Sequence, residues 1–237
     1  MKAPPHDLLE FERVLLDRGE VVVGIDEVGR GALAGPMTVG AVVMREEITP
    51  PDGLNDSKLL TPAQRSSLVD PLSRWASEWS LGSVSAQEID EWGLRLALAV
   101  AATRALNGLS SPPTHALIDG SFNLLRSPLN VRFGASAPPP LRYEALPVTT
   151  IIKGDQRCAT IAAAAVLAKV DRDAHMVSLH DECDEYQWAS NKGYGTPAHL
   201  EAIRRFGRTT SHRLTWQVSG APASGRKLHS GQQGNEE

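Results

Sequence analysis

Two adjacent carboxylates, Asp26 and Glu27, directly follow the apolar run VVVGI at residues 21–25. A continuous β-branched run of this kind is typical of a strand that is buried on both faces. Because burying an unpaired carboxylate is costly, a buried strand rarely ends in two acids for packing reasons alone. Neighbouring side chains on a strand point to opposite faces. We therefore expect the strand to stop at about Asp26, so that the turn aims Glu27 toward the same site.

Two further aspartates have similar positions. Asp119 ends the apolar run HALI (115–118), and Asp155 follows VTTIIKG (148–154). Taken singly, Asp119 with Gly120 is a common turn pair, and Asp155 also fits the N-cap of the next helix. If the elements are neighbours in one sheet, however, the carboxylates converge at one edge and raise one another's pKa unless a cation neutralises them.

Carboxylate oxygens are the ligands that hard divalent cations prefer, and Mg²⁺ suits a site that leaves some positions to water and phosphate. Such a site favours in-line phosphoryl transfer, in which metals activate water and stabilise the leaving oxygen. The sequence therefore indicates metal-dependent phosphate chemistry at these acids.

The stretch GRGALAGP (29–36) allows two interpretations. Its glycines do not follow the G-x-G-x-x-G pattern of a dinucleotide-binding loop, and Pro36 would interrupt the helix that such a loop needs. A nucleotide-binding Rossmann domain would bind NAD, which we do not expect here. The alternative is a loop whose backbone closely approaches a phosphate or ribose, with Arg30 nearby, because glycine permits close contact.

Periodicity, caps and turn residues predict the elements that position these residues. Strands are expected at 21–25, 37–44, 79–85, 114–119 and 148–152, the first two as an antiparallel pair. Helices are expected at 6–19, 61–75, 85–106, 158–170 and 196–207, and the helix at 158–170 is apolar nearly all round and so buried. This order predicts one α/β domain with a mixed sheet.

Bulk composition excludes several classes. The chain has 237 residues and a net charge of -4, which argues against a polycation that coats nucleic acid. The two cysteines, Cys158 and Cys183, lack metal-site spacing and make no disulfide framework. There is no signal-peptide pattern and no apolar stretch of membrane-spanning length. We expect a cytoplasmic protein without membrane contact.

Five blocks of the sequence together closely resemble bacterial ribonuclease HII, of the type 2 ribonuclease H family. They occur in the family's order between about residue 20 and about residue 217. The blocks are GIDEVGRGALAGP (24–36), NDSKLLTPAQR (55–65), ALIDGS (116–121), IIKGDQRCATIAAAAVLAKVDRD (151–173) and NKGYGTPAHLEAIRRFG (191–207) with SHR (211–213). Each block alone would be weak, whereas the combination is specific.

The resemblance implies a ribonuclease-H-like fold, with a mixed central sheet flanked by helices and a helical C-terminal extension. It implies a single catalytic domain at 1–218, including an extension at about 176–218. The small, polar and Gly-rich sequence from Ser219 onward predicts a disordered tail at 219–237. The implied enzyme is an endonuclease that cleaves the RNA strand of RNA–DNA hybrids and incises 5′ to ribonucleotides embedded in duplex DNA. The products carry 3′-hydroxyl and 5′-phosphate ends, and the role is ribonucleotide removal in DNA replication and repair.

The resemblance also assigns residues. The catalytic and metal ligands, for Mn²⁺ or Mg²⁺, are Asp26, Glu27, Asp119 and Asp155. The residues expected at the substrate are Gly29, Arg30 and Gly31, which read the ribose 2′-hydroxyl mostly through backbone, Tyr194 at the junction sugar, and Lys58 near the phosphates. Two ions are expected, one activating water and one stabilising the departing 3′-oxygen. The protein is expected to act as a monomer.

The sequence departs from the family pattern at three places. Ala165 stands where serine is more common, and Trp92-Gly93 stand where Asn-Ile is more common. The interval 121–147 is long for a bacterial member, and we interpret it as a surface loop insertion. These departures leave the assignment of the motifs unchanged.

Charge near the C-terminus supports the same interpretation. Residues 191–217 contain five basic side chains and one acid, Glu201, an excess that can bind a phosphate backbone. A solvated helix face is the alternative, and we favour substrate contact for part of the cluster. The basic residues are Lys192, Arg204, Arg205, Arg208 and Arg213. The acidic run at 180–187 is expected to be solvated.

Three rivals remain. Ribonuclease HI would place its glutamate on a later helix, not next to the first aspartate. Ribonuclease HIII shares the Asp–Glu pair but usually has an extra N-terminal domain, for which the residues before Asp26 are too few. A non-catalytic hybrid-binding module could retain the fold, but the intact acids argue against it.

Overall fold

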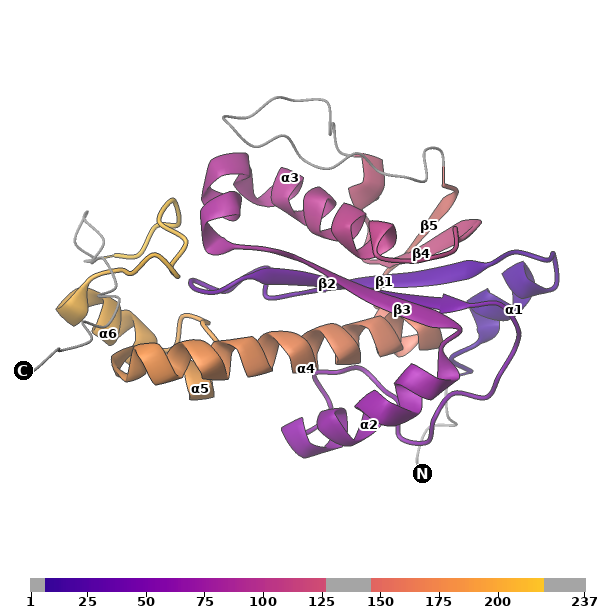
Figure 1. Cartoon of the computed structure of the whole chain (residues 1–237), viewed down its shortest axis with the longest axis horizontal. Coiled ribbons are helices and arrows are strands. Elements are labelled where there is room, and N and C mark those ends of the chain that lie inside the picture. The colour runs from indigo at the N-terminus through magenta and orange to yellow at the C-terminus, as the bar shows by residue number, and fades with distance from the viewer. Residues whose placement is uncertain (1–6, 127–145, 220–237) are drawn as a thin grey trace, which may run out of the picture.

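The computed structural model describes residues 7–126 and 146–219. Its centre is a five-stranded mixed sheet in the order β3-β2-β1-β4-β5 (Figure 1). The strands are β1 (Val22–Val28), β2 (Met37–Met44), β3 (Glu78–Val84), β4 (His115–Asp119) and β5 (Val148–Ile151). β1 is antiparallel to β2 and parallel to β4, so the predicted mixed sheet is confirmed.

The described helices are α1 (Glu10–Leu16), α2 (Pro62–Trp75), α3 (Ala86–Asn107), α4 (Ala159–Glu182), α5 (Trp188–Asn191) and α6 (Pro197–Phe206). Four of them, α2, α3, α4 and α6, begin within one residue of the predicted start, whereas α1 begins four residues later than predicted and α5 was not predicted. Thr61 with Gln64 and Ser85 with Glu88 form the expected capping boxes of α2 and α3. α3 is interrupted at Gly93, whose φ of 73° and ψ of 155° are not helical.

The helices cover the sheet on both sides. α3 packs on one face and α4 on the other, with α2 beyond α4 (Figure 1). Alternate residues of β1 and β2 therefore contribute to two apolar cores, which explains why the sequence of these strands is apolar at nearly every position. Val23 and Ile25 face α3, whereas Val42 and Met44 face α4 and α2.

α4 lies unusually close to the sheet because two strand residues on its side are glycines. A Cβ built at Gly24 would lie 2.3 Å from the carbonyl carbon of Thr160, and one at Gly40 would lie 2.4 Å from the carbonyl oxygen of Ala164. Both distances are too short for any side chain. The alanine-rich sequence of α4 thus fits a contact of helix backbone against strand backbone.

α1 fixes the start of α4. The Glu12 carboxylate accepts hydrogen bonds from the backbone N–H (2.9 Å) and the hydroxyl (2.8 Å) of Thr160, and the Leu8 carbonyl accepts one from the N–H of Ala159. Burial raises the pKa of Glu12 to about 7. Two of the N-terminal N–H groups of α4, those of Ala159 and Thr160, are therefore satisfied by a segment that precedes them by more than a hundred residues.

Two expectations about element ends, and one of the alternatives, are wrong. β1 does not stop at Asp26 but continues to Val28, because Asp26, Glu27 and Val28 remain paired with β2. Asp155 is not the N-cap of α4; it lies in a 3₁₀ turn at Gly154–Gln156, and the cap is Cys158. α4 extends to Glu182 instead of residue 170, because its second half packs one face on a further core.

That further core lies at the end of α4 and beyond the sheet. Its buried members come from the loop after β1, from α4 and from the C-terminal segment; they are Ala34, Met176, Cys183, Tyr186, Trp188, Ala202 and Ile203. The predicted tail beyond 219 and the loop at 127–145 of the predicted insertion lie outside the described residues. Among the described residues, no helix is long and apolar enough to cross a membrane.

We expect Gly40→Ala to lower the free energy of unfolding by about 2 kcal/mol or more, because α4 must move away from the strand to admit the methyl group. Urea unfolding of wild type and variant measures the change. Gly31→Ala is the matched control, since a Cβ there has nothing within 4 Å and Gly31 has no positive φ. Equal stability of the Gly40→Ala variant and wild type would contradict the close packing.

Candidate active site

The register of the sheet brings Asp26 and Asp119 to the same edge. β1 pairs with β4 as far as Ile25 opposite Ile118, so the next residue of each strand is an aspartate. Side chains that are opposite each other in a parallel pair point to the same face. Both carboxylates consequently lie on the α4 side of the sheet, where Gly24, two residues before Asp26, contacts α4.

Asp155 reaches this edge from the turn after β5. Its Oδ2 accepts a hydrogen bond of 3.0 Å from the Lys58 ammonium group. In the same turn, the Gly154 N–H donates to Asp119 Oδ1 at 2.6 Å. Asp56 anchors the Lys58 loop to this turn, because it accepts hydrogen bonds from the Lys58 backbone N–H and from Gln156 Nε2.

Glu27 approaches the site from the other face of β1. Because the strand continues, its backbone alternates with that of Asp26, and the turn does not re-aim it as the sequence suggested. Its longer side chain still lines the same cavity as Asp26, and Arg30 Nη1 lies 3.4 Å from its Oε1. Glu27 therefore joins the group through the length of its side chain and not through a strand end.

The electrostatics agree with a group of mutually repelling acids. Burial raises the pKa of Asp26 well above its usual range, and the charges of Asp119, Glu27 and Asp155 raise it further. Burial also raises the pKa of Glu27 and of Asp155, and the nearby Asp119 charge adds to both. Lys58 and Arg30 oppose this effect at Asp155 and Glu27 respectively. The four acids thus carry more negative charge than Lys58 and Arg30 neutralise.

Each of the four carboxylates is engaged by a donor of the protein. In the described ranges, no three Asp, Glu, His or Cys side chains stand together as a ready-made metal cage. Asp26 accepts from the Glu27 N–H at 2.7 Å, and the other three accept from the donors given above. The hard-oxygen donor set and its uncompensated charge fit a divalent cation, and the side chains have to turn toward one another to share it.

A small cavity of about 160 Å³ joins the acids to the expected substrate residues. It is lined by Asp26, Glu27, Val28, Gly29, Arg30, Gly31, Ser57, Lys58, Lys169 and Tyr194. The structure therefore brings all predicted substrate residues to the place where two of the acids lie. Lys169 was not predicted for this site; it pairs with Asp173 at 2.6 Å, and its Nζ lies 5.9 Å from the centre of the Tyr194 ring.

The structure requires a glycine at position 29 but not at position 31. Gly29 has a φ of +85°, and a Cβ there would lie 2.1 Å from Nε of Arg172. Gly31 is exposed, has no positive φ, and would place a Cβ in open space. The protein's own packing explains Gly29 but not Gly31, so the small size of Gly31 leaves room for a group outside the chain.

Two buried histidines hold the segment that carries Tyr194. The Thr209 N–H donates to His212 Nδ1 at 2.9 Å, and His199 Nδ1 faces the Tyr194 carbonyl at 2.9 Å. These partners require His212 to carry its proton on Nε2 and His199 on Nδ1. His212 Nε2–H then donates to His199 Nε2 at 3.2 Å, which also accepts from Trp188. With these hydrogen bonds both imidazoles are neutral, and burial lowers the pKa of His199 and of His212.

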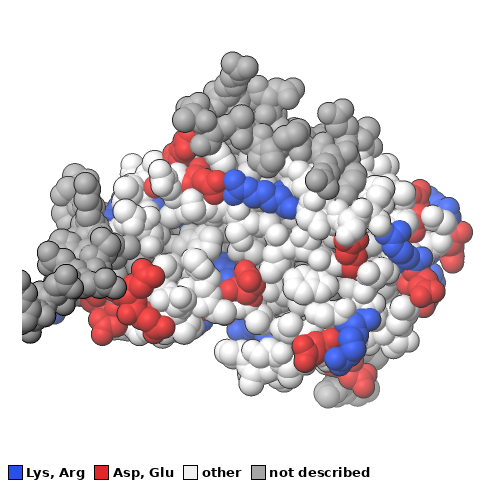
Figure 2. Space-filling model, in the orientation of Figure 1, with Lys and Arg blue, Asp and Glu red and all other residues white. Residues whose placement is uncertain are grey.

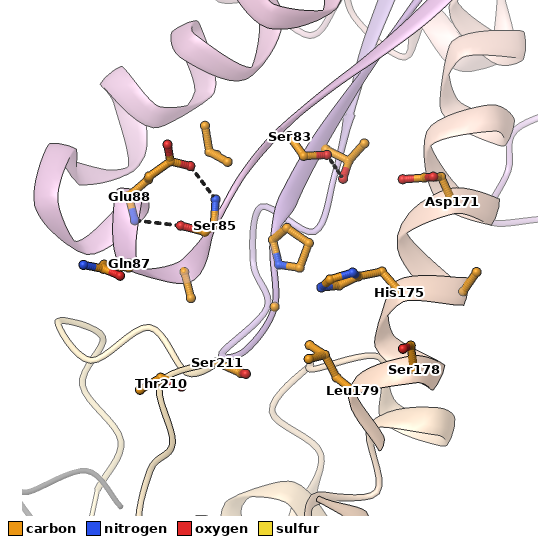
Figure 3. Close-up of a pocket in the computed structure, with 16 residues that line it drawn as sticks. Ser83, Ser85, Gln87, Glu88, Asp171, His175, Ser178, Leu179, Thr210 and Ser211 are labelled. Carbon is orange, nitrogen blue, oxygen red and sulfur yellow. Dashed lines mark hydrogen bonds between the residues drawn. The ribbon is translucent and has the colours of Figure 1, made fainter. Parts of the chain in front are cut away.

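A second, larger cavity is separate from the acids. It has a volume of about 830 Å³ and lies between the N-terminal end of α3, the second half of α4 and the loop at 210–211 (Figure 3). α4 contributes Asp171, His175 and Ser178 to it, which at 100° per residue lie on the side of the helix opposite Lys169. Glu88 in its wall is already bound by Ser85 and Arg104.

Part of the predicted basic cluster is unavailable to a ligand. Arg213 is 1% exposed, and Arg208 donates to the carbonyls of Leu214 and Trp216. Arg204 pairs with Glu201 and remains exposed. On the face shown in Figure 2, charges of both signs are interspersed, and Asp and Glu gather at the end of the molecule near the C-terminal end of α4. No large basic surface appears on that face.

A mixed five-stranded sheet between helices, with Asp26 and Asp119 side by side on its central strands β1 and β4, is the architecture of the ribonuclease-H-like fold. The family model for ribonuclease HII matches residues 23–219. A ribonuclease HII of Streptomyces griseus is 41% identical over 216 residues, which cover 90% of this chain and 84% of that protein. A ribonuclease HII of Jannaschia sp. is 44% identical over 207 residues, which cover 87% of this chain and 93% of that protein.

The solved structures agree with the sequence relatives. The crystal structure of the ribonuclease H2 from Pyrococcus horikoshii has a TM-score of 0.63 and 27% identity, and covers 84% of this chain and 95% of that one. The chain belongs to the ribonuclease HII family.

The histidine chain makes stability depend on pH. The pKa of His212 in the folded protein is lowered to about 3 from its usual 6.5, so the unfolded chain binds the proton first as the pH falls. The contribution of His212 to the free energy of unfolding is therefore complete above pH 6.5. It is lost as the pH falls toward 3, by about 1.4 kcal/mol per pH unit.

We expect the stability difference between wild type and His212→Asn to shrink by about 2 kcal/mol between pH 6.5 and pH 5. The asparagine Oδ1 replaces the Nδ1 acceptor but does not titrate. Urea unfolding of both proteins at pH 8, 6.5 and 5 measures this difference. A difference that stays constant with pH would show that His212 is not held neutral.

Proposed function

We propose that the protein is an endoribonuclease that hydrolyses the RNA strand of RNA–DNA hybrids. It also incises 5′ to ribonucleotides embedded in duplex DNA and leaves 3′-hydroxyl and 5′-phosphate ends. The observation that supports the proposal most strongly is one small cavity. It is lined by two of the four acids, Asp26 and Glu27, together with Gly29–Gly31 and Tyr194. The acids suit a phosphodiester, and the loop with Tyr194 suits the ribose next to it.

Divalent metal, Mn²⁺ or Mg²⁺, is part of the proposal, held by Asp26, Glu27, Asp119 and Asp155. When bound, it supplies activated water and charge stabilisation for in-line hydrolysis of a phosphodiester. Burial, with the charges of the other three acids adding to it, raises the pKa of Asp26, and this crowding of acids supports the ligand set. Because Asp155 Oδ2 already accepts from Lys58, an ion at Asp155 competes with that contact.

The cationic side chains around the cavity position the substrate strand. Lys58 is exposed while its ammonium group lies at Asp155, so it can contact a phosphate next to the scissile one. Arg30 is exposed beside Glu27 in the same way. Tyr194 is 37% exposed and lines the cavity beside Lys169, so part of its ring is accessible to a sugar.

The 2′-hydroxyl distinguishes RNA from DNA at a single nucleotide. We assign its recognition to the backbone of Gly29, Arg30 and Gly31, supported by the open space at Gly31. The proposal also includes that the protein is cytoplasmic, that it acts as a monomer and that its catalytic domain spans residues 1–218. The two buried free cysteines suit a reducing compartment.

We expect Asp26→Asn to reduce cleavage of a duplex with one ribonucleotide by roughly a hundredfold or more in Mg²⁺ or Mn²⁺. Removing one of four crowded acids also relieves repulsion, so the variant should melt at or above the wild-type temperature. Mapped product ends and thermal unfolding measure the two effects. Asp171→Asn, an exposed acid of α4 outside the site, is the control.

Two outcomes would contradict this assignment. Cleavage that is undiminished in Asp26→Asn would remove the proposed metal site. Binding of the hybrid by wild type without any cleavage would favour a non-catalytic hybrid-binding module.

Gly31→Ala tests the recognition loop separately. We expect kcat/KM for the ribonucleotide duplex to fall by about tenfold or more, because the methyl group occupies the space of the ribose, while the melting temperature stays unchanged. Steady-state kinetics with a melting curve measure both. Full activity of this variant would place the ribose elsewhere.

A further inference from the structure

Arg213 is buried under the Gly29–Pro36 loop and holds its carbonyls. Its Nη1 donates to the Arg30 carbonyl at 2.7 Å, and its Nη2 donates to the Gly29 carbonyl at 2.6 Å. Longer contacts of 3.3 and 3.4 Å reach the carbonyls of Gly35 and Pro36. One guanidinium group thus binds both ends of the loop.

The peptide geometry gives these contacts a direction. In a trans peptide, the C=O of one residue and the N–H of the next point to opposite sides. Because Arg213 draws the carbonyls of Gly29 and Arg30 inward, the N–H groups of Arg30 and Gly31 point away from it. Among the described residues, neither N–H has a hydrogen-bond acceptor, and both residues are exposed and line the cavity of the acids.

Arg172 connects the same loop to the tyrosine segment. It donates to the carbonyls of Pro36 at 2.8 Å, Ala34 at 3.2 Å and Lys192 at 2.9 Å. Its guanidinium carbon also lies 5.5 Å from the centre of the Tyr194 ring. The loop and Tyr194 are therefore fixed relative to each other by one buried side chain.

The two arginines are not charge partners of acids. Within the described ranges, neither forms an ion pair, and burial lowers the pKa of both, that of Arg213 to about 10. Each donates to backbone carbonyls, and the rigid fork of a guanidinium group fixes two carbonyls in one plane, which an ammonium group does not do. Their contacts set backbone orientation.

We propose that Arg213 is a positioning residue that turns the peptide N–H groups of Arg30 and Gly31 toward the substrate, and that Arg172 sets the distance between this loop and Tyr194. The proposal rests on the proposed function, since it names how the loop presents donors to the ribose oxygen. Arg213 itself does not touch the substrate.

Binding discrimination tests the proposal. We compare Kd for a duplex with one ribonucleotide and for the same duplex in DNA alone, with Ca²⁺ as the metal, in wild type and Arg213→Met. We expect the preference for the ribonucleotide to fall by about tenfold, with Kd for DNA unchanged. Arg208→Met is the matched control, because Arg208 also donates to two carbonyls but to none in this loop.

Arg213→Lys separates positioning from stability. It keeps the charge but loses the fork, so we expect a preference between those of wild type and Arg213→Met. A variant that is merely unstable would lose binding-competent protein and weaken both Kd values equally. Unchanged preference in folded Arg213→Met, or full preference in Arg213→Lys if the methionine variant does not fold, would overturn the proposal.

A measurement without substrate distinguishes this proposal from the proposed function. The ¹H–¹⁵N signals of Arg30 and Gly31 should shift in Arg213→Lys and stay in place in Arg208→Met. If wild type shows no preference for ribonucleotides, the proposed function fails, and these shifts still decide whether Arg213 orients the loop. Unshifted signals would overturn the positioning role.

Discussion

The direct contact between α4 and the central strands is the constraint on which the rest of the structure depends. Without side chains at Gly24 and Gly40, the helix lies against the strand backbone, and its alanines leave no room for it to move closer or turn. The start of α4 then lies beside the Asp155 turn, and Ala164, about one and a half turns along the helix, contacts Gly40, the residue that is paired with Asp26. One rigid helix consequently sets the distance between acids that come from different strands.

Beyond Ala168, α4 has a different task, because there it brings two cations to the loop that follows β1. Lys169 and Arg172 lie there, one beside the cavity of the acids and one beneath the Gly29–Pro36 loop. The same helix thus packs against the strand that carries Asp26 near its start and contributes Lys169 and Arg172 farther along. In the proposed function, the acids bind metal, and the cations hold phosphates and the recognition loop.

Local signals in the sequence predicted much of this architecture. The capping boxes at Thr61 and Ser85 fixed two helix starts, since each depends only on residues three positions apart. The end of β1 was predicted wrongly, because pairing with β2 carries the strand past Asp26. The basic cluster was predicted in part: charge counts do not reveal that Arg213 is buried among carbonyls.

What the sequence by itself determined is the set of chemical groups: the acids, the glycine loop, the tyrosine, and the family to which their order belongs. Only the tertiary structure decided how these groups face one another. Glu27 joins the acids by side-chain length from the far face of its strand, and the loop's N–H groups are turned outward by an arginine more than a hundred residues away. Residue types and short spacings follow from local chain geometry, whereas contacts between distant segments depend on packing that no short window of sequence contains.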